Sequence, residues 1–475
     1  MTLVAGIDSS TQSCKVTIRE LASGREIRHG KALHPPGTIV DPDLWWLALL
    51  QAVDRAGGLA DVSAVSVSGQ QHTPIFLDAH GDVVCNSPLW NDTGSHPQLM
   101  ALNNELGRDE WIRRTGLPIT LSDTVTKLRW LRDMHPQEAD RTAAVAIVHD
   151  WLTWRLRGYG PDDHELSALT TDRSEASGTG YWSPDTESYC PDLVEHALGQ
   201  SADLPRILMP TDSAGTTGGD LPGIPAGITV GIGSGDNAAA ALALGLAAGD
   251  AVLSLGTSGV VYTRSATPVH DYAGYVCNYA DALGEYLPLV ATLNAARNLD
   301  AGATVLGCTY EELAQLALQA PAGAAGLTVL PYFEGERTPD LPTARASLHG
   351  ASLTNLTRAN VARAVIEGTV VSQVAMLDAL AACGIHPSRL LLIGGAAGNP
   401  AVQVSLAQSV NLPVLLPAAE EYVARGAALQ AAAALEGGFR KWPIQATALP
   451  SQPPNPHIRE QHAAAQAAMG YRPVS

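Results

Sequence analysis

Short apolar runs that end in small polar residues recur along the chain. Residues 3–18 contain an apolar run, a polar turn and a second β-rich run, and residues 251–263 repeat that arrangement. Runs of this length between turn-forming residues are typical of buried strands, so each region predicts a strand, a polar turn and a strand. Because the same unit starts twice, the pattern predicts two similar α/β domains that meet near residue 245.

Three further apolar runs lead into polar or glycine-rich turns. The run 64–68 precedes Gly69-Gln70-Gln71-His72, and the run 228–232 precedes a Gly-Ser-Gly-Asp-Asn turn and an alanine-rich helix. The run 390–393 precedes a glycine-rich segment at 394–398. These runs predict strands whose ends carry the candidate chemistry.

Helices are expected between the strands. Asp41-Pro42 supplies an N-cap and a first-turn proline for a helix that Gly57-Gly58 ends. Residues 97–200 contain several amphipathic stretches separated by Gly and Pro, so this region is predicted to be mostly helical.

Composition narrows the class of protein. The 475 residues carry a formal net charge of −18, and 46% of them are hydrophobic. Such a chain is too apolar to be disordered, and its length predicts two or three domains. The acidic balance argues against nucleic acid or an anionic membrane as partner, because both bind a cationic face.

Targeting and redox signals point to the cytoplasm. The N-terminus has no basic region, and the longest uncharged stretch, 390–419, is interrupted by Gly and Pro. We therefore expect neither a signal peptide nor a membrane span. The six cysteines lie far apart without a CxxC pair, which favours free thiols in a reducing compartment.

Two carboxylates stand at turns that could bind phosphate. The Ser/Thr/Gly turns after residues 8 and 255 expose backbone N–H groups and hydroxyls, which form a cradle for phosphate oxygens. Asp8 beside the first cradle could hold a hydrated Mg²⁺ or cap its own turn. Asp236 could be the N-cap of the alanine-rich helix, or a base that accepts the proton of an alcohol. We expect the helix N-terminus and nearby amides to keep Asp236 ionised at pH 7.

Polar and aromatic groups near residues 70–92 suit a polyhydroxylated ligand. Gln71 and His72 offer both donors and acceptors, although a lone His is more often structural. Trp90 offers a face for a sugar, and Asp92 adds a polar group. Arg337 could meet a phosphate, but a surface ion pair is the favoured interpretation.

Together these segments resemble the FGGY family of carbohydrate kinases, and within it most closely the xylulokinases. The resemblance extends over nearly the whole chain. It rests on Gly-Ile-Asp at 6–8, Gly-Gln-x-His at 69–72, Trp-Asn-Asp at 90–92, Gly-Asp-Asn-Ala-Ala at 235–239, Leu-Ser-Leu-Gly-Thr-Ser-Gly at 253–259, Gly-Glu-Arg-Thr-Pro at 335–339 and Leu-Ile-Gly-Gly at 392–395.

The resemblance implies two actin-like (ribonuclease H-like) α/β domains around a cleft: a sugar-binding domain at 1–244 and an ATP-binding domain at 245–475. It also implies an enzyme that uses ATP and Mg²⁺ to phosphorylate a ketose, most closely D-xylulose to D-xylulose 5-phosphate, and a possible homodimer. Asp236 matches the catalytic base and Asp8 the acid near Mg²⁺. The sugar positions match Gln71, His72, Asp236 and Asn237. The ATP positions match Ser10, Thr11 and Gln12 in the first phosphate loop, Gly256, Thr257 and Ser258 in the second, and Gly394, Gly395 and Asn399 at the adenosine.

The chain departs from the family pattern at three places. Many relatives carry Gly at the positions of Ser10 and Ser13, and bacterial xylulokinases often carry Met at the position of Gln71. The segment 394–399 also differs from the commoner Gly-Gly-Gly-Ala-Arg-Ser. The alternatives are therefore an FGGY kinase for ribulose, gluconate or glycerol, or an actin/Hsp70-like ATPase on the same fold.

Overall fold

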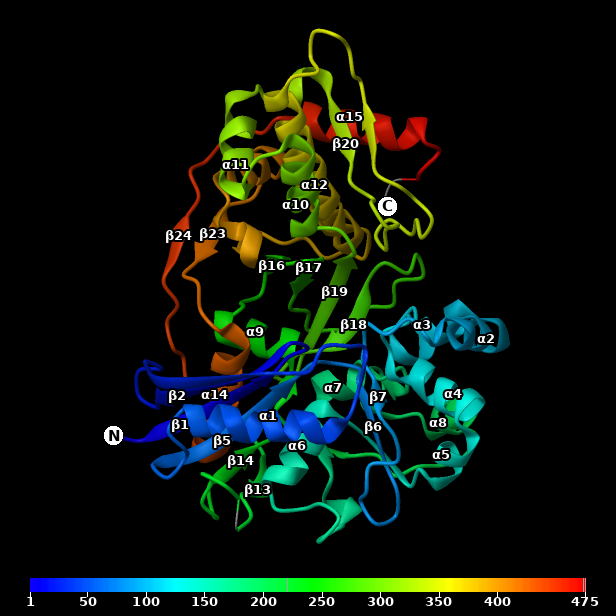
Figure 1. The fold of residues 1–475 in the computed structure, drawn as a ribbon, viewed down its shortest axis with the longest axis vertical. Coiled ribbons are helices and arrows are strands. Elements are labelled where there is room, and N and C mark those ends of the chain that lie inside the picture. Colours follow the sequence, from blue (N-terminus) through cyan, green and yellow to red (C-terminus); the bar gives the residue numbers. More distant parts are fainter. Residues whose placement is uncertain (220, 473, 475) are drawn as a thin grey trace.

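The computed structural model describes residues 1–219, 221–472 and 474, in two lobes that are each built on a seven-stranded sheet (Figure 1). The N-terminal sheet has the order β13 (Ser213–Thr216), β14 (Thr229–Gly231), β5 (Val62–Gly69), β1 (Leu3–Ser9), β2 (Ser13–Glu20) and β3 (Glu26–Leu33), with β15 (Ser234–Gly235) beside β5. The C-terminal sheet has the order β18 (Cys277–Ala280), β19 (Tyr286–Thr292), β17 (Gly259–Thr263), β16 (Asp250–Leu255), β22 (Arg389–Ile393), β23 (Val414–Pro417) and β24 (Ala446–Ala448).

The two sheets repeat one topology. In the first, β1 pairs antiparallel with β2 and parallel with β5. In the second, β16 pairs antiparallel with β17 and parallel with β22. The predicted repetition of one α/β unit is therefore confirmed. Parallel strands end at the same edge of a sheet, so the polar turns after these strands gather at one edge of each lobe.

Helices cover the sheets largely where the pattern places them. The helix α1 (Pro42–Arg55) begins after Asp41, whose carboxylate accepts a hydrogen bond from the Asp43 amide at 3.0 Å, and packs on β2 and β3. The region 97–200 is mostly helical, as predicted. Its helices are α2 (His96–Leu106), α3 (Arg108–Thr115), α4 (Thr124–Met134), α5 (Pro136–Arg141), α6 (Val148–Leu156), α7 (Arg173–Ser177) and α8 (Pro191–Leu198).

Short strands and further helices connect the two sheets to the rest of each lobe. The short strands are β4 (Ile39–Val40), β6 (Pro74–Leu77), β7 (Ser87–Pro88), β8 (Ala144–Ile147), β9 (Thr170–Thr171), β10 (Trp182–Ser183), β11 (Ser188–Tyr189), β12 (Arg206–Ile207), β20 (Thr328–Leu330) and β21 (Ser347–His349). The C-terminal lobe also contains α10 (Ala296–Leu306), α11 (Tyr310–Gln319) and α15 (Pro456–Ala468).

The alanine-rich stretches form two helices that pack against each other between the sheets. These are α9 (Asp236–Leu244) and α14 (Tyr422–Glu436). A Cβ on Gly426 would lie 2.0 Å from the Ala239 carbonyl oxygen, so this approach requires glycine. Although α14 follows residue 245 in sequence, it packs on β1 and β5 of the N-terminal sheet (Figure 1). The predicted boundary at 244/245 therefore separates the strands of the two sheets, but α14 follows the boundary in sequence and packs on the N-terminal lobe.

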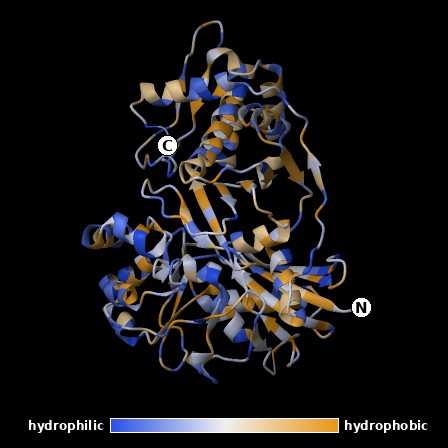
Figure 2. Cartoon of the chain, turned by 180° about the vertical axis from the view of Figure 1, so that it is seen from behind, coloured by the Kyte–Doolittle hydropathy of each residue, from blue (hydrophilic) through white to orange (hydrophobic). Residues whose placement is uncertain are grey.

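The longest helix, α12 (Arg358–Ala382), is long and apolar enough by composition to cross a membrane. In the protein, 83% of its most apolar window is buried, and it packs against α10, α11 and α13 (Pro400–Ser409). Hydrophobic residues are likewise concentrated on the strands of both sheets (Figure 2). The burial of α12 is that of a core helix.

The two lobes are in contact beside α7. The backbone N–H of Ala280 donates to Ser177 Oγ at 2.9 Å, and that of Asn278 donates to the Gly116 carbonyl at 3.1 Å. The Tyr286 hydroxyl donates to the Pro184 carbonyl at 2.8 Å. The strands β18 and β19 therefore extend from the C-terminal sheet onto the N-terminal lobe, and they bring Tyr279 to within 5.7 Å of the His72 ring, centroid to centroid.

Candidate active site

A cavity of about 490 Å³ lies where the polar turns of the two lobes meet. Asp8, Lys15 and Asp236 line it from the N-terminal lobe, and Gly394 and the segment 419–423 line it from the other side. A second cavity, of about 480 Å³, shares Gly394 and Tyr422 with the first and extends over 445–447. Each has the volume of a typical small-molecule site.

Asp236 is the first residue of α9 and follows the N-cap Gly235, so it is not itself the cap. Its Oδ1 accepts hydrogen bonds from the Asn237 backbone N–H at 2.7 Å and from Asn237 Nδ2 at 2.9 Å. Burial, with a smaller contribution from the Asp8 charge, raises the pKa of Asp236 to about 7. Desolvation therefore outweighs the amides, which were expected to keep Asp236 ionised at pH 7.

Asp8 is the last but one residue of β1, lines the same cavity and is 2% exposed. Its Oδ1 accepts from Ser10 Oγ at 2.6 Å, and its Oδ2 lies 3.4 Å from Lys15 Nζ. Lys15 Nζ also donates to Glu421 Oε2 at 2.7 Å. Burial raises the pKa of Asp8, and Lys15 opposes that shift.

The described residues contain no cluster of three or more His, Cys, Asp or Glu side chains able to hold a metal ion. Mg²⁺ usually keeps several waters and takes only one or two carboxylates together with phosphate oxygens. A single carboxylate that faces a cavity, as Asp8 does, therefore fits this ion without a protein cage.

The first predicted phosphate loop is a tight turn between β1 and β2. The Ser10 N–H donates to the Ser13 carbonyl at 3.1 Å, and Thr11 Oγ1 accepts from Trp90 Nε1 at 2.9 Å. Gln12 is exposed, and its carbonyl accepts from the His34 N–H at 2.9 Å. None of residues 10–13 has a positive φ, so serine needs no glycine-like backbone here.

The second predicted loop joins β16 to β17. The carbonyls of Gly256 and Thr257 accept from the backbone N–H groups of Ala296 and Ala295, at 2.9 and 3.2 Å. These bonds fix the loop against the start of α10 and leave the Thr257 and Ser258 side chains at the surface.

The third glycine segment follows β22. Gly394 has φ +96°, and a Cβ there would lie 2.6 Å from the Leu255 carbonyl oxygen, so this position accepts only glycine. Gly394 and Gly395 line the first cavity. Asn399 is 4% exposed, and its Oδ1 caps α13 by accepting from Ala401 N at 3.0 Å. Its predicted adenosine contact remains a prediction.

Gln71 contacts Asn237, and His72 follows Gln71 in the chain. Gln71 Nε2 donates to the Ser174 carbonyl at 3.2 Å, and its Oε1 accepts from Asn237 Nδ2 at 3.3 Å. His72 Nδ1 donates to the Gly178 carbonyl at 2.6 Å, which leaves Nε2 as an acceptor. Burial lowers the pKa of His72, so the ring is neutral. Its φ of +71° is unusual for a non-glycine residue and is typical of a functional site.

The Trp90–Asp92 turn is less clearly placed for sugar binding. The Trp90 side chain is half-exposed and bonds to Thr11. The Asp92 carboxylate accepts from Gly94 N at 2.8 Å and from Thr38 Oγ1 at 2.7 Å, so the turn uses both oxygens. Contact of either residue with a sugar remains a prediction.

Two lysines near the site were missed by sequence reasoning. Lys15 lines the cavity, and Lys127 on α4 donates to the Asp92 carbonyl at 2.6 Å and to Ser95 Oγ at 2.9 Å. Burial lowers the pKa of Lys127 to about 8. A signal existed, because Lys127 lies at helical spacing among the apolar positions of α4, where a charge is unusual.

The structure also corrects the expectation that Arg337 forms a surface ion pair. It forms no ion pair within 4.0 Å among the described residues, and its Nη2 lies 3.4 Å from the Cys277 sulfur. The charge of Asp123 is among the causes that raise the pKa of Arg337. The surface ion pair was therefore wrong: Arg337 reaches into the region of His72.

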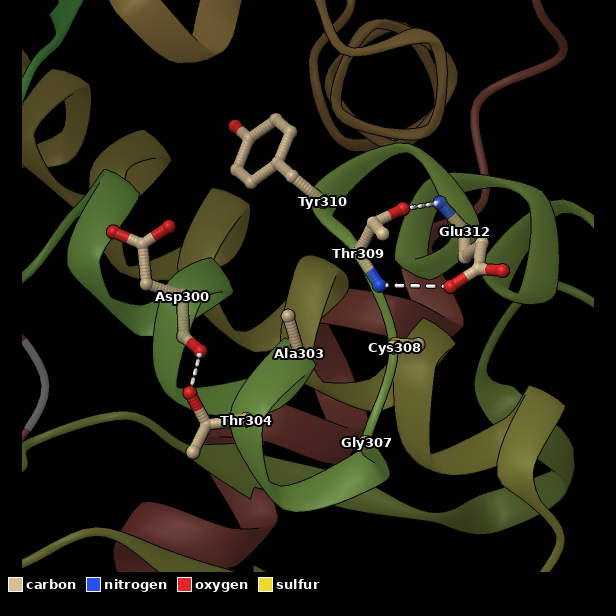
Figure 3. A pocket seen from close by; sticks show the side chains of 8 residues that line it. All are labelled: Asp300, Ala303, Thr304, Gly307, Cys308, Thr309, Tyr310 and Glu312. Carbon is tan, nitrogen blue, oxygen red and sulfur yellow. Dashed lines mark hydrogen bonds between the residues drawn. The ribbon is translucent and has the colours of Figure 1, made fainter.

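A separate hollow of about 460 Å³ lies between α10 and α11 (Figure 3). Its polar groups serve local structure: Thr309 and Glu312 form a capping box, and Thr304 Oγ1 donates to the Asp300 carbonyl at 2.8 Å. It shares no lining residue with the two cavities above, so we do not assign it to the site.

The comparisons with known proteins agree with this geometry. The model of the FGGY family of carbohydrate kinases, N-terminal domain, matches residues 3–243, and that of the C-terminal domain matches residues 251–435. The chain is 41% identical over 444 residues to the xylulose kinase of Streptomyces rubiginosus, covering 92% of this chain and 88% of that protein.

Solved structures show the same fold. The crystal structure of xylulose kinase from Bifidobacterium adolescentis superposes with a TM-score of 0.92 at 41% identity, over 98% of this chain and 99% of that one. The gluconate kinase from Lactobacillus acidophilus superposes with a TM-score of 0.88 at 22% identity, over 99% of each chain. The second likeness shows the fold alone, so the fold does not select the sugar.

The predicted resemblance and the two-domain actin-like fold are confirmed by these matches. Kinase activity on a carbohydrate implies ATP and a small sugar as the substrates. The chain belongs to the FGGY family of carbohydrate kinases.

Proposed function

We propose that the protein transfers the γ-phosphoryl group of ATP to the 5-hydroxyl of D-xylulose and forms D-xylulose 5-phosphate. The observation that carries the proposal is 41% identity, over nearly the whole chain, to a protein named xylulose kinase. The contact of Gln71 with Asn237, which lines the cavity together with Asp236, supports it.

In this proposal Asp236 accepts the proton of the attacking hydroxyl. Its carboxylate is oriented by two hydrogen bonds from Asn237, and Asn237 is in turn held by Gln71. Ser174 fixes this arrangement from α7, because its Oγ accepts from the Gly235 N–H at 2.9 Å and its carbonyl accepts from Gln71. Such bracing positions the base before the substrate binds.

The phosphates are proposed to lie between the turn 10–12 and the turn 256–258. Lys15 is the one Lys or Arg among the described residues that line the first cavity, and its Nζ lies between Asp8 and Glu421. Asp8 would hold Mg²⁺, which when bound neutralises phosphate charge during transfer. Backbone amides, hydroxyls and one lysine replace the basic surface that this acidic protein lacks.

A panel assay tests the substrate. With ATP and Mg²⁺, coupled ADP release should be fastest with D-xylulose, and slower with D-ribulose, D-gluconate and glycerol. Gluconate or glycerol as the preferred substrate would overturn the sugar assignment but not the family. ADP release that is independent of any sugar would favour the alternative of an actin/Hsp70-like ATPase.

The pH dependence follows from the pKa of about 7 for Asp236. The base must be ionised to accept a proton, so kcat/KM should rise as pH increases towards 7 and reach a plateau above it. Below pH 6 it should fall about tenfold per pH unit. Initial rates between pH 5 and 9 measure this, and a flat profile down to pH 5 would contradict the role of Asp236.

We propose a cytoplasmic location, and the charge of the chain and its cysteines support it. An acidic chain whose six cysteines are all unpaired suits a reducing cytoplasm, without nucleic acid or a membrane as partner. A homodimer is proposed by resemblance to the family, and gel filtration with light scattering tests it.

A further inference from the structure

Two opposite charges from different lobes face one region beside His72 without pairing. Asp123 precedes α4 in the N-terminal lobe, and Arg337 belongs to the C-terminal lobe. Asp123 Oδ1 lies 3.7 Å from His72 Nδ1, and the Arg337 charge helps to lower the pKa of His72. Tyr279 and Cys277 on β18 complete the wall, since Tyr279 contacts the His72 ring and Cys277 contacts Arg337.

Asp123 has one oxygen without a partner. Its side chain is 3% exposed, and Oδ2 accepts from the Thr120 N–H at 2.5 Å and from Thr120 Oγ1 at 3.1 Å. Oδ1 is buried and accepts no hydrogen bond in the described part of the chain. An unsatisfied buried carboxylate oxygen is costly, so native sites usually provide a partner for it.

The backbone of Arg337 is held in place by hydrogen bonds of its neighbours in the chain. The Glu336 carboxylate accepts from the backbone N–H groups of Arg337 at 2.8 Å and Leu293 at 2.6 Å, and from Asn294 Nδ2 at 2.9 Å. Thr338 Oγ1 donates to the Ala291 carbonyl at 2.8 Å. Within the described part of the chain, the guanidinium itself donates only to the thiol of Cys277, which is a weak acceptor.

We propose that Arg337 and Asp123 together bind the hydroxyketone end of the sugar. This end is opposite to the hydroxyl that Asp236 deprotonates. This deepens the proposed function and rests on it. A guanidinium only donates hydrogen bonds and an ionised carboxylate only accepts them. They therefore match a carbonyl, which only accepts, beside a hydroxyl, which donates. The substrate class is an open-chain ketose with a carbonyl at C2 and a hydroxyl at C1.

The pair also discriminates by hydrogen-bond type. A polyol would leave the Arg337 donors facing a hydroxyl instead of a carbonyl. Because Arg337 and Asp123 come from different lobes, a correct sugar would also link the lobes at this end of the site.

The test uses three substrates and two variants. Arg337→Gln should lower kcat/KM for D-xylulose about 10- to 100-fold, because it removes charged hydrogen bonds to the carbonyl. It should lower kcat/KM much less for xylitol, which has a hydroxyl in place of that carbonyl. Asp123→Asn should lower kcat/KM for D-xylulose about 10-fold or more, but hardly for 1-deoxy-D-xylulose, which lacks the C1 hydroxyl.

Controls separate recognition from damage to the fold. Arg345→Gln and Asp340→Asn change exposed residues on the segment that carries Arg337, and should leave the ketose preference unchanged. The KM for ATP and the melting temperature should stay close to those of the wild type in all variants. Equal losses on every substrate would overturn the proposal and indicate a structural role. A wild-type enzyme inactive on any ketose would instead refute the proposed function.

Discussion

Replacing Asp236 by Asn is expected to lower kcat by about 10²- to 10⁴-fold, the range in which a positioned general base contributes. The amide has nearly the same shape, but it cannot accept the proton of the attacking hydroxyl. Asn237 and Gln71 remain to hold the sugar, so binding should survive. Coupled ADP release measures the turnover, and isothermal titration measures the affinity for D-xylulose.

The control for this variant is Asp162→Asn, which changes an exposed carboxylate of the N-terminal lobe that lines neither cavity of the site. It should leave kcat unchanged. Near-normal turnover in Asp236→Asn would remove Asp236 as the base, whereas loss of sugar binding together with turnover would assign it a binding role.

Replacing Asp8 by Asn is expected to lower kcat about 10²- to 10³-fold, as the loss of one preorganised electrostatic group commonly does. The Mg²⁺ concentration required for half-maximal rate should rise, because the carboxylate proposed to hold the ion is gone. Removal of the Asp8 charge should also lower the pKa of Asp236, since that charge helps to raise it.

The acid limb of the pH profile for Asp8→Asn should therefore move to lower pH than in the wild type. This second measurement separates a charge effect from a general loss of structure, which would lower the rate at every pH without moving the limb. An unchanged Mg²⁺ requirement would contradict the proposed metal role of Asp8.

Local patterns were sufficient for the strands, the turns and the family. The strand–turn–strand units at 3–18 and 251–263 appear as β1–β2 and β16–β17, because a short apolar run between turn formers has few other ways to be buried. The motif residues Asp8, Asp236 and Gly394 line one cavity, because each follows a parallel strand at the same edge of its sheet.

Local sequence patterns could not predict where α14 packs. Its alanines predict a tightly packed helix but not the partner, and it lies on the N-terminal sheet although it follows the second sheet in sequence. The placement of Arg337 was missed for a similar reason. Its local surroundings, Glu-Arg-Thr-Pro, are those of a surface loop, and only the approach of the other lobe places it beside His72 and Asp123.

By itself, the sequence determined the two α/β units, the family and the positions of the polar turns, since these depend on neighbours along the chain. The tertiary structure alone decided the ionisation of Asp236, because desolvation depends on what surrounds the carboxylate and outweighed the helix N-terminus. It also decided which groups lie near His72. Asp123 and Arg337 are 214 positions apart in the sequence, and only the contact between the lobes brings both of them near His72.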